Sequence, residues 1–211
     1  MKNLVLICAG GFGREIAAWA PNCIGYNKDW KIKGFIDSDL KRLDKLKSQY
    51  NIIDTIKNYQ PKDDDVFLCA IGDVTLKKKF VKTISNRGGK FINLIHNSVI
   101  FSSVNINIGN GCFIGPGTII SNDVTIHDHV TLNCRIHVSH DVVISKFSHA
   151  NPFSFIGGYV FIGENVIIHP NSTIVPNIRI GDNSIIGSGS VVLKNVKQGI
   201  TVFGIPAKKI Y

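Results

Sequence analysis

The chain has 211 residues, of which 44% are hydrophobic, and a formal net charge of +9 at pH 7. This length suits one large domain or two small ones, and no apolar run reaches the roughly 18 residues that a membrane-spanning helix needs. The five cysteines are widely spaced and contain no CxxC pair, which predicts reduced thiols in a cytoplasmic protein.

The positive charge is concentrated in the first part of the chain. Residues 1–90 carry 17 Lys and Arg against 10 Asp and Glu, whereas residues 91–211 carry 7 against 5. The lysines gather in stretches predicted as helical, such as 41–47 and 77–79, without interleaved aromatic residues that could stack on bases. We therefore expect a solvated lysine-rich face, with phosphorylated small molecules as the alternative and no nucleic-acid partner.

Residues 1–96 alternate strand-like and helix-like segments. Apolar runs predict strands at 4–8, 32–36, 66–71 and 91–95, and helical patterns follow at 14–20 and 76–85. This alternation predicts an α/β domain with a small Rossmann-like parallel sheet. Ligands of such sheets bind beyond the carboxyl ends of the strands.

Glycines and carboxylates lie at those predicted strand ends. The sequence AGGFG at 9–13 would let backbone N–H groups approach a phosphate, although Ile16 replaces the third glycine of a GxGxxG motif. A plain tight turn is the alternative. Asp37 and Asp39 could accept hydrogen bonds from a ribose or a base, or could serve as turn and capping residues.

Residues 97–211 follow a period of six. From Ile108 to Val192 every sixth residue is aliphatic, fifteen times in succession. This period is typical of a parallel β-helix whose three short faces make a turn of about eighteen residues, and we predict about five turns. We also predict an irregularity between Ile100 and Ile106, and a tail over 199–211 that leaves the repeat and caps its end.

Six of the seven histidines lie at or after residue 127. Because the interior of such a coil is apolar, their side chains are predicted to point outward, where neighbouring subunits could meet. His140 precedes Asp141, and an imidazole beside a carboxylate suits general-base chemistry at neutral pH. A surface histidine in a turn is the alternative. His137 and His140 have a spacing compatible with zinc, but no known ligand framework accompanies them, so we predict no metal.

Several segments together resemble one known family. They are AGGFGRE at 9–15, GFID at 34–37, AIG at 70–72, NLIH at 93–96, LN at 132–133, SHD at 139–141, FSH at 147–149 and GIPAK at 204–208. Through them the whole chain resembles the hexapeptide-repeat sugar O/N-acyltransferases, which include sialic-acid O-acetyltransferases and nucleotide-amino-sugar N-acetyltransferases of bacterial surface-glycan pathways. The resemblance implies a nucleotide-sugar-binding domain over 1–96, an all-β left-handed parallel β-helix over 97–211, and a homotrimer with active sites between subunits.

The resemblance also implies roles for individual residues. It gives catalytic roles to His140 as the base, to Asp141 beside it and to Asn133, which helps to position it. The residues expected to bind acetyl-CoA as co-substrate are His149, Gly158, Pro170, Gly187, Ser188 and Pro206. The residues expected to bind the nucleotide-linked amino sugar are Gly11, Phe12, Gly13, Arg14, Asp37, Asp39 and Gly72. Some relatives have a histidine where this chain has Phe12.

The sequence therefore leads us to expect a cytoplasmic enzyme that moves an acetyl group from acetyl-CoA to the amine of a nucleotide-activated amino sugar, for example in O-antigen synthesis. Acetylation of a sugar hydroxyl, as in sialic acid, is the first alternative. A non-catalytic trimeric scaffold that senses a nucleotide is the second. Binding of nucleic acid through the basic N-terminal half is a third reading, and it would require salt-dependent affinity for DNA.

Overall fold

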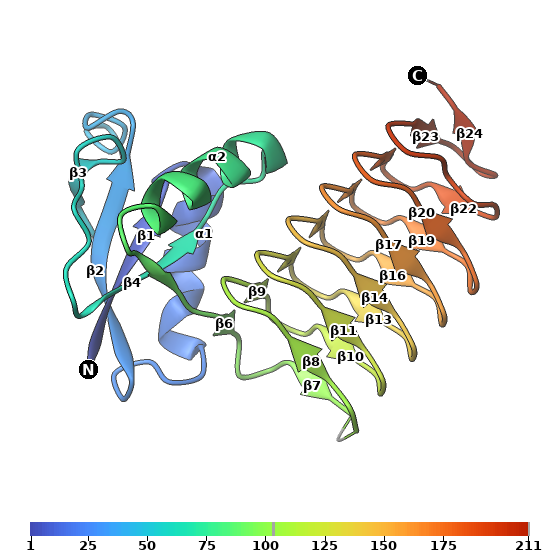
Figure 1. Ribbon diagram of the computed structural model, residues 1–211, viewed down its shortest axis with the longest axis horizontal. Helices are drawn as coiled ribbons and strands as arrows, with labels where there is room; N and C mark the ends of the chain where they lie inside the picture. The colour runs from blue at the N-terminus through green and yellow to red at the C-terminus, as the bar shows by residue number, and fades with distance from the viewer. Residues whose placement is uncertain (103, 211) are drawn as a thin grey trace. The chain divides into compact units, whose positions relative to one another are not determined.

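The computed structural model describes residues 1–102 and 104–210, and the chain divides into two compact units, Met1–His96 and Asn97–Tyr211. The N-terminal unit is an α/β domain (Figure 1). Its strands are β1 (Lys2–Ile7), β2 (Trp30–Asp37), β3 (Ile52–Thr55), β4 (Asp65–Cys69), β5 (Lys90–Phe91) and β6 (Leu94–Ile95). Its helices are α1 (Gly11–Trp19), α2 (Val74–Ser85) and the short 3₁₀ helix η1 (Ala20–Asn22). Neither of the two described α-helices is long and apolar enough to cross a membrane.

The five main strands of this unit form a parallel sheet in the order β3-β2-β1-β4-β5. This confirms the predicted α/β fold. The order makes β1 and β4 neighbours, and the chain winds outward from them in opposite directions, which creates the switch point where such sheets bind ligands. All five residues of β4 are buried, as expected of a strand in the middle of a sheet covered on both faces.

Two details of the sheet differ from the sequence prediction. The edge strand β3 was not predicted, because none of its four residues is fully buried and its apolar pattern is correspondingly weak. The strand expected over 91–95 is two separate two-residue strands, β5 and β6.

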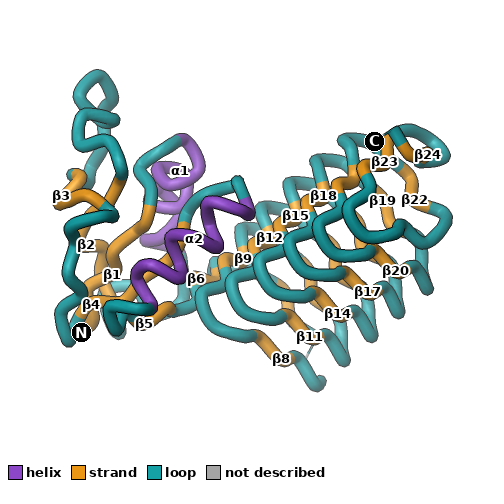
Figure 2. The backbone as a smooth tube through the Cα atoms, turned by 45° about the horizontal axis from the view of Figure 1, so that its top comes forward, coloured by secondary structure: helices purple, strands orange, loops and turns teal. Residues whose placement is uncertain are grey.

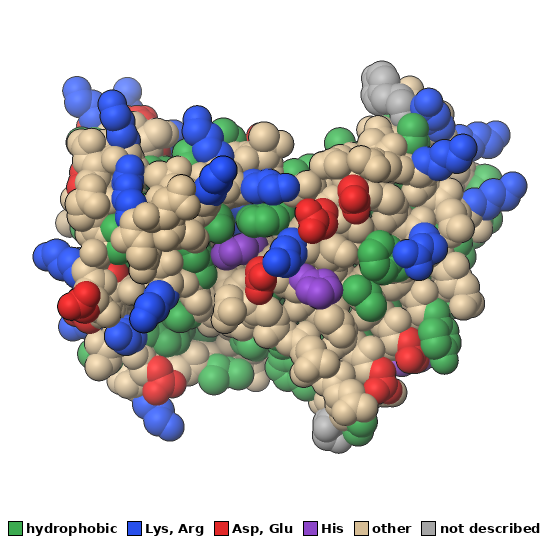
Figure 3. All heavy atoms as spheres, viewed as in Figure 1, with side chains coloured by type: hydrophobic (Ala, Val, Ile, Leu, Met, Phe, Trp, Pro, Cys, Tyr) green, Lys and Arg blue, Asp and Glu red, His purple; other side chains and the backbone are tan. Residues whose placement is uncertain are grey.

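The lysine-rich stretches also differ from expectation. Residues 40–45 form turns and no helix, and Lys77 on α2 is 1% exposed, whereas its neighbours Lys78 and Lys79 are exposed. Lys and Arg side chains are nevertheless spread over the face of the N-terminal unit that Figure 3 shows. The prediction of a solvated basic face thus holds for much of this stretch and is wrong for Lys77.

Helix α1 begins at Gly11, three residues earlier than predicted, because the glycine-rich turn forms its first turn. A Cβ atom on Gly13 would collide with the carbonyl oxygen of Cys8, whereas a Cβ on Gly11 would meet nothing within 4 Å. Cys8 itself takes a φ of 80°, which turns the chain sharply from β1 into the helix. Gly13 is therefore required by packing.

The C-terminal unit is a β-solenoid of hexapeptide repeats (Figure 2), which confirms the repeat prediction. Three parallel sheets run along it. The first contains β7 (Ile100–Phe101), β10 (Ile119–Ile120), β13 (His137–Val138), β16 (Phe155–Ile156), β19 (Thr173–Ile174) and β22 (Val191–Val192). The second contains β8 (Asn107–Ile108), β11 (Thr125–Ile126), β14 (Val143–Ile144), β17 (Phe161–Ile162) and β20 (Arg179–Ile180). The third contains β9 (Phe113–Ile114), β12 (Thr131–Leu132), β15 (His149–Ala150), β18 (Ile167–Ile168), β21 (Ile185–Ile186), β23 (Thr201–Phe203) and β24 (Lys208–Lys209).

Neighbouring strands of each sheet are one turn of the coil apart. Ile119 of β10 lies opposite His137 of β13, a separation of 18 residues. The pairing of β10 with β7 is different, because Ile119 lies opposite Ile100, 19 residues away. The first turn thus contains one extra residue, in agreement with the irregularity predicted from the sequence. Ser103, which falls in that stretch, lies outside the described residues.

The aliphatic positions of the repeat form the core of the solenoid. From Ile114 to Val192 each of them is at most 3% exposed, and Ile108, at the first of these positions, is partly exposed. The corners also repeat, because every sixth residue from Asn105 to Gly189 takes a φ between 50° and 72°. Left-handed residues at this interval turn the chain from one sheet to the next.

The end of the solenoid is more regular than predicted. Thr201–Phe203, at the start of the expected tail, still adds a parallel strand to β21. The chain leaves the repeat after this strand, and β24 then pairs antiparallel with β23 along its outer edge. Tyr211, the last residue of the expected tail, lies outside the described residues.

Candidate functional site

His140 lies at a corner of the solenoid, between β13 and β14. Because one turn contains 18 residues, the corner positions 122–123, 140–141 and 158–159 stack above one another. We call these three residue pairs the His140 column. The side chain of His140 is 51% exposed, so it points away from the apolar interior, as predicted for this residue.

The imidazole of His140 is oriented by its neighbour in the chain. Its Nδ1 lies 2.8 Å from Oδ2 of Asp141, whose own φ of 58° brings the carboxylate alongside the ring. A proton on Nδ1 that is donated to the carboxylate leaves the lone pair on Nε2. Nε2 can then accept a proton from a bound molecule, and the carboxylate stabilises the imidazolium that forms.

The next turn of the column supports the ring from one side. A Cβ atom on Gly158 would lie 2.7 Å from Cε1 of His140, so the imidazole packs directly on the glycine backbone. The ring of Tyr159 meets the imidazole edge-on, with centroids 5.2 Å apart. The N–H of Gly158 has no hydrogen-bond acceptor among the described residues, which leaves it available to an oxygen atom beside His140.

The turn on the other side of His140 contributes a second carboxylate, Asp123. Hydrogen bonds from the side chains of Asn105 and Asn122 hold the pKa of Asp123 below its usual value, and nearby His140 acts in the same direction. Sequence analysis missed Asp123 and Tyr159. The signal that could have found them is the repeat itself, because they stand 18 residues before and after Asp141.

Asn133 lies apart from His140 within one protomer. It stands at the corner between β12 and β13, is 7% exposed, and accepts a hydrogen bond from the backbone of Cys134 with its Oδ1 at 2.8 Å. The corresponding corners of later turns hold Pro170, Gly187 and Ser188. The residues expected to act together therefore occupy two different corners of the coil.

Two further expected residues differ in exposure. His149, on β15, is 4% exposed, which corrects the prediction that the histidines of the repeat lie open on the surface. The alternation along β15 still directs its side chain away from the interior, which Ala150 faces. Pro206 is exposed in the segment between β23 and β24.

A cavity of about 320 Å³ opens at the carboxyl ends of β1 and β4 in the N-terminal unit. It brings together four residues that the sequence predicted for substrate binding, namely Gly11, Phe12, Asp37 and Gly72. Cys8 also lines it, and burial, with a contribution from Asp37, raises the pKa of this thiol to about 12. Cys8 is therefore no reactive thiolate at neutral pH.

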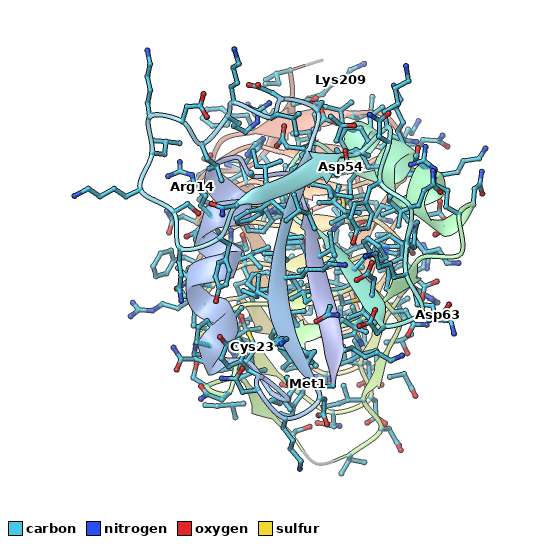
Figure 4. The ribbon with its side chains drawn as sticks, turned by 90° about the vertical axis from the view of Figure 1, so that its left-hand side faces the viewer. Met1, Arg14, Cys23, Asp54, Asp63 and Lys209 are labelled. Atoms are coloured by element: carbon cyan, nitrogen blue, oxygen red, sulfur yellow. The ribbon has the colours of Figure 1, made fainter. Side chains whose placement is uncertain are left out.

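Three other predicted residues lie away from this cavity's walls. Gly13 is buried against Cys8, and exposed Asp39 accepts a hydrogen bond from the backbone of Lys41. Arg14 lines a separate cavity of about 440 Å³ between α1 and residues 47–50. Figure 4 shows Arg14 on α1, at the opposite edge of the unit from Met1.

Asp37 differs most from its expected role. It is 2% exposed, and its Oδ2 accepts the N–H of Ala9 at 2.8 Å. Its Oδ1 accepts Nε of Arg42 at 2.9 Å and the N–H of Asp39 at 3.0 Å. Burial acts to raise the pKa of Asp37, but these hydrogen bonds outweigh it and hold the pKa below its usual value. Both oxygens are engaged within the protein, so the carboxylate is not the open acceptor for a ribose that the sequence suggested.

The described residues contain no group of three His, Cys, Asp or Glu side chains arranged to hold a metal ion. His140 instead pairs with a single carboxylate, Asp141, at hydrogen-bond distance. The chemistry that this corner offers is proton transfer.

Comparisons with known proteins agree with this architecture. Residues 3–84 match the family described as PglD N-terminal domain, and residues 159–194 match the family described as bacterial transferase hexapeptide (six repeats). A search of curated protein sequences finds no match.

Solved structures match over the whole chain. GDP-perosamine N-acetyl transferase from Caulobacter crescentus, as a mutant bound to CoA and GDP-perosamine, is 23% identical with a TM-score of 0.89, covering 100% of this chain and 98% of that one. The acetyltransferase domain of PglB from Neisseria gonorrhoeae, bound to acetyl coenzyme A, is 24% identical with a TM-score of 0.88 and covers 99% of both chains. WeeI from Acinetobacter baumannii is 20% identical with a TM-score of 0.75 over 100% of both. These likenesses concern the fold. Taken with the two family matches, they show that the chain belongs to the PglD-like family of hexapeptide-repeat proteins.

Proposed function

We propose that this protein transfers an acetyl group from acetyl-CoA to the amine of a nucleotide-linked amino sugar. The observation that carries the proposal is the exposed imidazole of His140, held by Asp141 and packed on Gly158. The glycine-lined cavity of the N-terminal unit supports a nucleotide as the carrier of the sugar. The structural relatives with CoA and GDP-perosamine, or with acetyl coenzyme A, support the choice of both substrates.

In this reaction His140 is the general base. Its Nε2 accepts a proton from the amine as the new carbon–nitrogen bond forms at the thioester carbonyl. Asp141 holds the ring in orientation and stabilises its charged form. The N–H of Gly158 points to the role of an oxyanion donor, since it has no acceptor among the described residues. The carbon–sulfur bond then breaks, and the thiolate of CoA leaves and takes up a proton.

A homotrimer completes the proposal. Asn133, Pro170, Gly187 and Ser188 occupy a different corner of the coil from His140, so they can serve the same reaction only from a neighbouring copy. Light scattering on the eluted protein should give three times the mass of one chain. We also propose that the enzyme works in the cytoplasm, where acetyl-CoA and nucleotide sugars are made.

The proposal is tested by incubating the protein with acetyl-CoA and a panel of UDP-, GDP- and dTDP-linked amino sugars, followed by mass spectrometry. An acetylated product whose acetyl group survives mild alkali is an amide and supports the proposal. A product that loses it under those conditions is an ester and would indicate acetylation of a hydroxyl. No acetylation of any acceptor, with the nucleotide still bound, would favour a nucleotide-sensing scaffold.

Substitution of Gly158 by alanine should lower kcat by about 100-fold, because the new methyl group occupies the space of the His140 ring and displaces it. Steady-state kinetics measure the effect. The double variant with His140→Ala is the control, since without the ring the added methyl group should cost little more. Losses that simply multiply in the double variant would show that Gly158 acts independently of His140.

A further inference from the structure

We propose that Arg42, held in place by Asp37, anchors the diphosphate of the nucleotide-linked substrate in the cavity of the N-terminal unit. This inference rests on the proposed function, because it assumes that the cavity binds a nucleotide. It assigns Arg42, a residue from the irregular segment between β2 and β3, to recognition of the substrate, and it makes Asp37 a positioning residue.

The first support is the way Asp37 restrains the arginine. Nε of Arg42 donates to a carboxylate that is 2% exposed, whereas the arginine side chain is 41% exposed. The carboxylate therefore forms part of the wall and the guanidinium covers it. The carboxylate also raises the pKa of Arg42, so the pair stays charged throughout the neutral range.

The second support is the unused half of the guanidinium. Only Nε of Arg42 takes part in a hydrogen bond to the residues that the structure describes, and both Nη atoms remain available. An arginine whose inner nitrogen is fixed loses little further freedom when its outer nitrogens bind a ligand. Two outer N–H groups in one plane match two oxygens of a phosphate.

The third support is the start of α1 in the wall of the same cavity. Gly10 is the N-cap of this nine-residue helix, and the first turn contains neither a capping side chain nor an acidic residue. Gly10 and Gly11 both line the cavity together with Arg42. The positive end of the helix and the guanidinium thus act on one space, and the charge they favour is negative.

The fourth support is room for the rest of a nucleotide. A second cavity of about 580 Å³ shares Ser38 and Phe80 with the first, so the two adjoin. It contains Asn58 and Thr83, whose polar side chains could contact a base or a ribose. A ligand with a diphosphate at Arg42 and a nucleoside beyond Phe80 fits both spaces, whereas a free phosphate would leave the larger one empty.

Titration calorimetry with the full chain tests this inference, with UDP, GDP, their monophosphates and the two free nucleosides as probes. Arg42→Ala should weaken binding of the preferred diphosphate by about 10- to 100-fold, the usual contribution of charge-assisted hydrogen bonds to a phosphate. Binding of the nucleoside should change less than twofold. Arg42→Lys, which keeps the charge but cannot hold Asp37 and a phosphate together, should fall between the wild type and Arg42→Ala.

Lys41→Ala is the matched control, because it removes the same charge from the adjacent exposed position, which lines neither cavity. It should bind the diphosphate as the wild type does. Equal affinities for Arg42→Ala and Lys41→Ala would overturn the inference, as would an equal loss for the diphosphate and the nucleoside. Should Arg42→Ala fail to fold, Arg42→Lys and Arg42→Gln allow the same comparison.

The acetyl-transfer assay separates this inference from the proposed function. A protein that binds the diphosphate through Arg42 but acetylates no amino sugar would retain the anchor and contradict the enzymatic proposal. A protein that acetylates its substrate with an unchanged KM in the Arg42→Ala variant would do the opposite. A wild-type chain that binds none of the nucleotides would overturn both.

Discussion

Replacement of His140 by alanine should lower kcat by about 10²- to 10⁴-fold, which is the usual contribution of a general base. The reason is geometric, because Nε2 of this ring is the atom of the His140 column that is positioned to take a proton from the acceptor. The affinity for acetyl-CoA should change little, since the reaction loses its base while the binding contacts remain. Initial rates at saturating substrate, with calorimetry of CoA binding, measure the two effects separately.

His127→Ala is the matched control for this prediction. It removes another exposed histidine of the solenoid, from a corner between β11 and β12. Its rate should equal that of the wild type. Asp141→Asn should lie between the two, because the ring remains but the carboxylate that stabilises its charged form is gone. A His140→Ala enzyme within threefold of the wild type would rule out the assignment of the base.

Replacement of Gly13 by alanine should destabilise the N-terminal unit by about 2–3 kcal/mol, as is typical when an extra methyl group enters a packed site. The new Cβ would collide with the carbonyl oxygen of Cys8, a backbone atom that cannot rotate away. The helix would have to shift from β1, and the cavity beside it would lose its shape. Urea unfolding followed by tryptophan fluorescence measures the change, because the chain's two tryptophans, Trp19 and Trp30, both lie in this unit.

Gly11→Ala provides the comparison, since a Cβ at this position would have open space around it. Its urea midpoint should stay close to that of the wild type or rise slightly, because alanine loses less chain entropy in a helix than glycine. If both variants unfold at the same urea concentration, the close approach of Gly13 to Cys8 does not exist in solution.

The solenoid could be predicted from the sequence because its physical cause is local and repeated. Each aliphatic residue from Ile114 to Val192 faces the same interior, so the pattern specifies the core residue by residue. The position of His140 and Asp141 at one outward corner follows from the same pattern. The parallel sheet and its glycine-rich turn were likewise visible, because apolar strands and glycines carry their own signals.

Other features depend on contacts that no local pattern encodes. The role of Arg42 arises because an irregular segment returns to Asp37, and such segments have no periodicity to read. The burial of His149 was missed because alternation along a strand gives the direction of a side chain but not what lies around it. The edge strand β3 carried too weak an apolar pattern to be seen.

The 18-residue interval between stacked strands also limits how this protein can change in length. Each coil touches only the coils before and after it. Insertion or deletion of one whole coil away from His140 would keep every remaining side chain on its original face. A single added residue would instead shift all that follows from inside to outside, and the one irregular interval lies between β7 and β10, in the first coil. The solenoid can thus lengthen or shorten in whole coils, while its reactive corner keeps the same surroundings.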